Sequence, residues 1–193
     1  NLAQTGAVRM SSSKILTNGT RLGSANGLVG HWSFDGGDTN WTSQTTGVAY
    51  DGSGNNNIGT LTSMDRASTP AIGKLGQAFN FDGSTDSVSV ADSATFDLTT
   101  SAQYSWSAWV KTDNLTSDVW HTIWAQSTGS VNDLVLYAHT VTDAELPGGS
   151  VTNGISAWWF QNSSNKILTE AEGAISANTW FHLVVTYDGS LAA

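Results

Sequence analysis

The chain has no cysteine and only two prolines among its 193 residues. Without cysteine no disulfide framework can hold the fold, which excludes the small cysteine-rich class of secreted domains. Charged residues make up only 12% of the sequence, and this low share argues against long, charged helices. No run of about 18 apolar residues occurs, so we expect no membrane-spanning helix. With 39% hydrophobic residues, the chain can still bury a core of its own.

Acidic residues are absent before Asp35, whereas Arg9, Lys14 and Arg21 lie in this first part of the chain. We interpret residues 1–26 as a basic N-terminal arm or linker. Two roles for the arm stay open: a solvated leader, or an assembly segment that docks on an acidic body, its own or a neighbour's. The whole chain has a net charge of −9, which disfavours nucleic acid and anionic membranes as partners.

Alternating apolar and polar residues predict β-strands over much of the chain after residue 27. The expected strands are 28–34, 77–81, 87–91, 104–111, 120–125, 134–138, 155–160 and 180–187. An Asp-Gly turn at Asp82 separates the second strand from the third, so we expect these two to pair as a hairpin. No segment has a helical period. The sequence therefore predicts an all-β fold of two packed antiparallel sheets.

Four segments, in this order, resemble the laminin-G-like, concanavalin-A-like jelly roll of secreted and cell-surface proteins. They are Gly-Leu-Val-Gly-His-Trp-Ser-Phe-Asp at 27–35, Lys-Leu-Gly-Gln-Ala-Phe-Asn-Phe-Asp-Gly at 74–83, Trp-Ser-Ala-Trp-Val-Lys at 106–111, and Trp-Phe-His-Leu-Val-Val-Thr-Tyr-Asp-Gly at 180–189. The resemblance implies one jelly-roll sandwich over residues 27–193, located outside the cell or at its surface. It also implies that Trp32, Trp109 and Trp180 lie in the core. Family members continue with further closing strands, so the C-terminal strands are expected to be missing here.

Catalytic carboxylates are poorly supported by the sequence. Glycosidases on related jelly rolls need two carboxylates that project from the same face into a cleft. The acidic pairs here are Asp35 with Asp38, Asp82 with Asp86, and Glu170 with Glu172. The last pair shares a strand face but precedes a glycine, and we interpret it as part of a solvated turn. Nucleophile-elbow, zinc-protease and phosphate-loop motifs are absent as well, so we expect no enzymatic activity.

Oxygen-bearing side chains indicate a calcium site near residue 51. Asp51, Asn55 and Asn57 fall at alternate positions of a glycine-rich stretch, and a tightly curved loop of this kind can supply several of the oxygens that Ca²⁺ prefers. Asp82 and Asp86 of the neighbouring turn could add carboxylates. The bound ion would be structural. The alternative stays open that these residues serve turn geometry alone.

Nine tryptophans are more than the expected core positions account for. Aromatic faces stack on sugar rings, and we select Trp41 and Trp159 as candidate ligand-binding residues. Trp159 and its neighbour Trp158 point to opposite faces of their strand, so at most one of them belongs to a given core. The alternative is that these tryptophans pack beneath loops.

Together these features predict a non-catalytic extracellular adhesion or recognition module, with a glycan or a surface protein as its partner. The alternative is a structural subunit of a cell-surface filament or surface layer. Such a subunit would self-associate through the N-terminal arm or through an open sheet edge.

Overall fold

The computed structural model of the chain describes residues 27–94, 96, 103–115, 119–126, 133–142, 150–160, 166–171, 173 and 175–188. These residues form β-strands and turns, with one short 3₁₀ turn, η2 (Gly36–Asp38), among them. The predicted all-β fold is confirmed. The described part of the chain contains no helix that is long and apolar enough to cross a membrane. The chain divides into two compact units, Asn1–Phe96 and Asp97–Ala193, which we describe separately.

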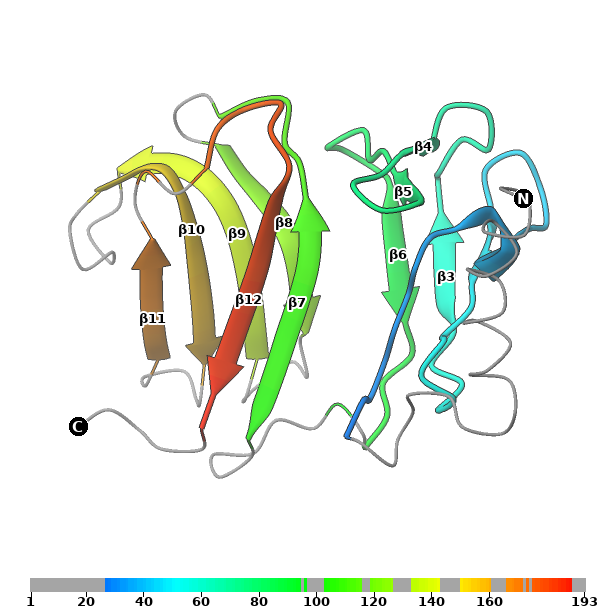
Figure 1. The fold of residues 1–193 in the computed structure, drawn as a ribbon, viewed down its shortest axis with the longest axis horizontal. Helices are drawn as coiled ribbons and strands as arrows, with labels where there is room; N and C mark the ends of the chain where they lie inside the picture. The colour runs from blue at the N-terminus through cyan, green and yellow to red at the C-terminus, as the bar shows by residue number, and fades with distance from the viewer. Residues whose placement is uncertain are drawn as a thin grey trace, which may run out of the picture. The chain divides into compact units, whose positions relative to one another are not determined.

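The first unit contains a four-stranded antiparallel sheet and a separate two-stranded hairpin. The order in the sheet is β1 (Thr39–Trp41), β2 (Gly47–Ala49), β3 (Gly59–Thr62) and β6 (Ser87–Val90). The hairpin pairs β4 (Pro70–Ile72) with β5 (Gln77–Phe79). Figure 1 shows β3 and β6 side by side in this unit. Every one of these strands has only three or four residues, which is why most of them carry no clear alternation in the sequence.

The core of the first unit lies on one face of this sheet. Its buried members are Ala49, Leu61 and Met64. Half-buried side chains pack against them, namely Trp32, Phe34, Trp41, Phe79 and Val88. Large aromatic residues therefore supply much of the apolar area that holds these short strands together.

The second unit contains two antiparallel sheets. The larger sheet has the order β11 (Lys166–Ala171), β10 (Ser150–Phe160), β9 (Asp133–Thr142) and β8 (Val119–Gln126). The smaller sheet pairs β12 (Phe181–Tyr187) with β7 (Tyr104–Val110). In Figure 1, β7 and β12 lie in front of the larger sheet. The sequence predicted β7, β8 and β12 closely, whereas β9 and β10 are longer than expected and β11 was missed.

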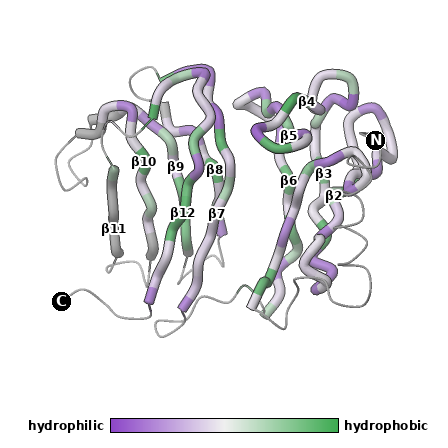
Figure 2. Tube along the Cα trace, in the orientation of Figure 1, coloured by the Kyte–Doolittle hydropathy of each residue, from purple (hydrophilic) through white to green (hydrophobic). Residues whose placement is uncertain are grey.

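Side chains from the two sheets meet between them. Leu134, Leu136 and Ala157 of the larger sheet are buried, and inward-facing residues of β7 and β12 pack against them, among them Tyr104, Trp106, Leu183, Val185 and Tyr187. The colouring of Figure 2 places hydrophobic stretches along β9 and β12. The alternation read from the sequence thus has its expected physical meaning here: every second residue of these strands faces the other sheet.

Two predictions for the first unit are wrong. The hairpin between residues 77–81 and 87–91 does not form, because β5 pairs with β4 and β6 pairs with β3. Residues 28–34 do not form a strand either. Their backbone groups bond to side chains of a later loop, and Phe34 has a positive φ of 59° that interrupts an extended chain.

The expected core position of Trp109 is also wrong. Its side chain is 41% exposed, because odd-numbered residues of β7 point away from the other sheet while Trp106 and Ala108 point inward. The other two tryptophans expected in the core are half-buried. Trp32 packs in the first unit, and Trp180 lies just before β12.

Tyr104 provides a test of packing between the sheets of the second unit. Burial, with a smaller contribution from Tyr187, raises the pKa of Tyr104 to about 12 from its ordinary value of 10.0. Because the folded state favours the neutral phenol, this contribution to stability is complete below pH 10 and is lost as the pH rises toward 12. Urea unfolding measures the free energy of unfolding at several alkaline pH values. This free energy should fall less steeply with rising pH for Tyr104→Phe than for the wild type. Equal slopes for the two proteins would contradict the packing.

Candidate functional site

The loop after β2 is organised around the carboxylate of Asp51. This side chain is only 8% exposed. Its Oδ1 accepts hydrogen bonds from the backbone N–H groups of His31 (2.9 Å) and Ser53 (2.8 Å). Its Oδ2 accepts from the Ser53 hydroxyl (2.7 Å) and the Asn57 N–H (3.0 Å). Burial tends to raise the pKa of Asp51, but these four hydrogen bonds outweigh it, so the pKa lies below 3.8.

The asparagines of this loop bind the chain segment that precedes η2. Asn55 donates from its amide nitrogen to the carbonyl oxygens of Leu28 and Val29, each at 2.9 Å. Asn57 donates to the Val29 carbonyl at 2.8 Å. These amides therefore work as donors to backbone oxygens, and the loop fastens two distant parts of the first unit to each other.

The other two predicted metal ligands lie in a separate turn between β5 and β6. The Asp82 carboxylate accepts hydrogen bonds from the N–H groups of Ser84, Thr85 and Asp86, and the Asp86 carboxylate accepts one from the Asp82 N–H. In the part of the chain that the structure describes, no three His, Cys, Asp or Glu side chains form a group that could hold a metal ion. Asp51, Asp82 and Asp86 are thus not brought together, and the calcium site stays a prediction.

A shallow pocket of about 340 Å³ opens beside the Asp51 loop. Its lining residues are Asp38, Tyr50, Asp51, Gly52, Gly54 and Asn56. Tyr50 is the aromatic member and is 42% exposed. The pocket therefore combines an accessible ring with carboxylate, amide and backbone groups, and none of the lining residues is basic.

Unusual backbone conformations shape the rim of this pocket. Asn56 has a φ of 61°, and Gly54 has a φ of 95°, both in the left-handed region that most residues avoid. At Gly52 a Cβ atom would come within 2.7 Å of His31 Nδ1, so only glycine fits there without displacing the imidazole. Residues held in such conformations often belong to binding sites.

Asp38 contributes a carboxylate from the end of η2. Its backbone carbonyl accepts a hydrogen bond from the Tyr50 N–H at 2.7 Å, which holds the aspartate next to the tyrosine. Its Oδ2 accepts from the Ser33 hydroxyl at 2.7 Å. Among the described residues, Asp38 Oδ1 has no hydrogen-bond partner, so it can accept a bond from a ligand hydroxyl.

The predicted sugar-binding tryptophans do not line this pocket. Trp41 is half-buried in the core of the first unit, with its ring 6.2 Å from that of Phe79. Trp159 lies in β10, where it pairs with Leu134 and Ile167, and its side chain is outside the described residues. The predicted assembly residues Arg9, Lys14 and Arg21 are also outside the described residues.

The sequence analysis did not select Tyr50 as a binding residue. It could have been selected because it is an aromatic residue directly before the Asp-Gly-Ser-Gly turn at 51–54, a position where a ring can lie at the rim of a loop. Only the fold reveals that Asp38, twelve residues earlier, lies against it.

Comparisons with protein-family models, with curated proteins and with solved structures found no match for this chain.

Proposed function

We propose that the chain is a non-catalytic glycan-recognition module that works outside the cell, and that the pocket at Tyr50 is its binding site. The observation that carries the proposal is the exposed Tyr50 ring beside the Asp38 carboxylate and the Asn56 amide. An aromatic face packs against the C–H groups of a pyranose, while carboxylate and amide groups bond its hydroxyls. The described residues that line the pocket include no lysine or arginine, so neutral sugars are the expected class of ligand.

The Asp51 carboxylate argues for binding rather than hydrolysis. A glycosidase needs a general acid whose pKa is raised toward neutral pH, alongside a second carboxylate. The pKa of Asp51 is lowered instead, because burial is outweighed by its four hydrogen bonds. Asp51 is therefore a structural anchor of the pocket wall, and its lowered pKa does not suit it to serve as the general acid beside Asp38.

We further propose the jelly-roll type of sandwich for the fold. In support, the pairs within both sheets of the second unit are antiparallel, and β7 pairs with β12 although four other strands lie between them in the chain. Long connections of this kind are typical of Greek-key and jelly-roll arrangements.

The test is binding of neutral oligosaccharides to the whole chain, first on a glycan array and then by titration calorimetry with the best ligand. Tyr50→Ala should weaken binding about tenfold or more, because the stacking surface is lost. Tyr50→Phe keeps the ring and should bind within about threefold of the wild type. Trp41→Ala and Trp159→Ala on the same array test the two residues selected from the sequence.

Two results would refute the proposal. One is the absence of any neutral oligosaccharide that binds the wild-type chain. The other is a Tyr50→Ala variant that binds as tightly as the wild type while Trp41→Ala or Trp159→Ala does not. Melting curves of each variant establish that it is folded before its binding is compared.

A further inference from the structure

The outer face of the β7–β12 sheet presents an unusual group of side chains. Trp109 lies in β7 and Lys111 directly follows this strand, while Trp180 directly precedes β12 and His182 lies in it. We call these four residues the aromatic-basic patch. They alternate with the inward-facing residues Val110 and Phe181, so they share the face that points away from the larger sheet.

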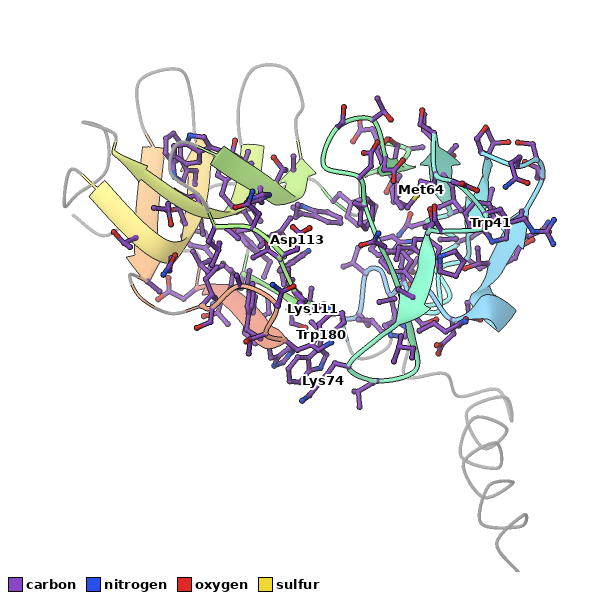
Figure 3. All side chains as sticks on the ribbon, turned by 90° about the horizontal axis from the view of Figure 1, so that it is seen from above. Trp41, Met64, Lys74, Lys111, Asp113 and Trp180 are labelled. Carbon is purple, nitrogen blue, oxygen red and sulfur yellow. The ribbon has the colours of Figure 1, made fainter. Side chains whose placement is uncertain are left out.

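Cross-strand contacts hold the patch together. The Trp109 and His182 rings stack with their centroids 4.9 Å apart and an angle of 26° between their planes. Lys111 Nζ lies 5.4 Å from the centroid of the Trp180 ring, which is a cation–π contact; Figure 3 labels both residues. The patch is therefore ordered in advance, although Trp109 is 41% exposed to solvent. An exposed tryptophan of this kind indicates an interaction surface.

The charge of the patch stands out against the rest of the chain. The whole sequence contains sixteen acidic residues and only seven lysines and arginines, and three of these seven precede Asp35. The patch combines a lysine and a histidine with two exposed or half-exposed indoles. A complementary partner would therefore offer carboxylates together with an apolar group.

The first unit carries a surface with that composition, the turn from Phe81 to Asp86, which we call the acidic turn. Phe81 is 45% exposed. Hydrogen bonds from the N–H groups of Asp86, Ser84 and Thr85 lower the pKa of Asp82 to about 2, so the turn is negatively charged at neutral pH. The same bonds fix its conformation, which reduces the entropy lost on binding.

We propose that the aromatic-basic patch of one copy binds the acidic turn of another copy. Phe81 would pack on the Trp109 ring, and Asp82 and Asp86 would face Lys111 and His182. Because the two surfaces differ and lie on different units, each copy offers one of each. Such a heterologous contact joins copies head to tail, in an open chain or a closed ring. This self-association is independent of the glycan function proposed above.

The experiment is sedimentation velocity of the whole chain over a wide concentration range at low salt. The wild type should show a sedimentation coefficient that rises with concentration, and added salt should weaken the association. Lys111→Glu reverses one charge of the patch and should weaken association about tenfold or more. Lys74→Glu makes the same charge change on the exposed turn between β4 and β5 and should associate as the wild type does.

A second variant makes the test specific to the two surfaces. Asp86→Arg should impair self-association in the same way as Lys111→Glu. A mixture of these two variants should associate more strongly than either variant alone, because the intact patch of Asp86→Arg matches the intact acidic turn of Lys111→Glu. The double variant should regain long assemblies.

A wild type that stays monomeric at every concentration would overturn the proposal. So would a Lys74→Glu variant that loses association as strongly as Lys111→Glu, because the effect would then follow net charge and not the patch. A mixture of the two single variants that stays monomeric would also overturn it. Melting curves for each variant separate loss of the contact from loss of the fold.

Discussion

Replacing Asp51 with alanine should cost the first unit about 3 kcal/mol or more of its free energy of unfolding. The substitution leaves three backbone N–H groups and the Ser53 hydroxyl without their charged acceptor. Each buried donor that loses its partner costs about 1–3 kcal/mol, and water entering from the adjacent pocket recovers part of the sum. Urea unfolding followed by tryptophan fluorescence measures the loss.

Asp92→Ala is the matched control, since this aspartate is exposed and should change stability by less than about 0.5 kcal/mol. Asp51→Asn keeps the size of the side chain but supplies only one acceptor oxygen, so its loss should fall between those of the other two variants. If Asp51→Ala were as stable as Asp92→Ala, the loop would not fasten residues 28–31 as the structure describes.

Replacing Leu136 with alanine should destabilise the second unit by about 2–5 kcal/mol. Leu136 lies in β9, is 0% exposed, and packs with Leu134 and Ala157 beneath the inward residues of β7 and β12. The truncation removes apolar contacts from both sheets and leaves a cavity between them. Chemical denaturation at neutral pH measures the change.

Val184→Ala is the control on the opposite face of β12, where the side chain is 53% exposed. This variant should cost no more than about 0.5 kcal/mol. Similar losses for Leu136→Ala and Val184→Ala would contradict a core placed between the two sheets, because the two positions would then be buried alike.

Strand prediction from the sequence succeeded where a strand was long and half-buried. In β7 and β12 seven residues alternate without interruption, and this period is a local property that needs no knowledge of the partner strand. Pairing is not local. Residues 77–79 and 87–90 are both strands, as expected, but each has a different neighbour, since the choice depends on which backbone edges the rest of the unit offers.

The candidate site was predicted in part. The sequence drew attention to Asp51, Asn55 and Asn57, and these residues do organise one loop. Their chemistry could not be read from their types, because a carboxamide can offer its oxygen to a metal or its N–H groups to a carbonyl. In the structure the amide nitrogens donate to the carbonyls of Leu28 and Val29, which lie more than twenty residues earlier in the chain.

The sequence alone determined the β character of the chain, the two faces of its longer strands and the acidic balance of its surface, since these follow from composition and from a period of two residues. The tertiary structure decided the rest. It exposes Trp109 and buries Asp51, and it sets Asp38 beside Tyr50. The physical reason is that exposure and hydrogen-bond partners are set by chain segments that meet only when the sheets assemble.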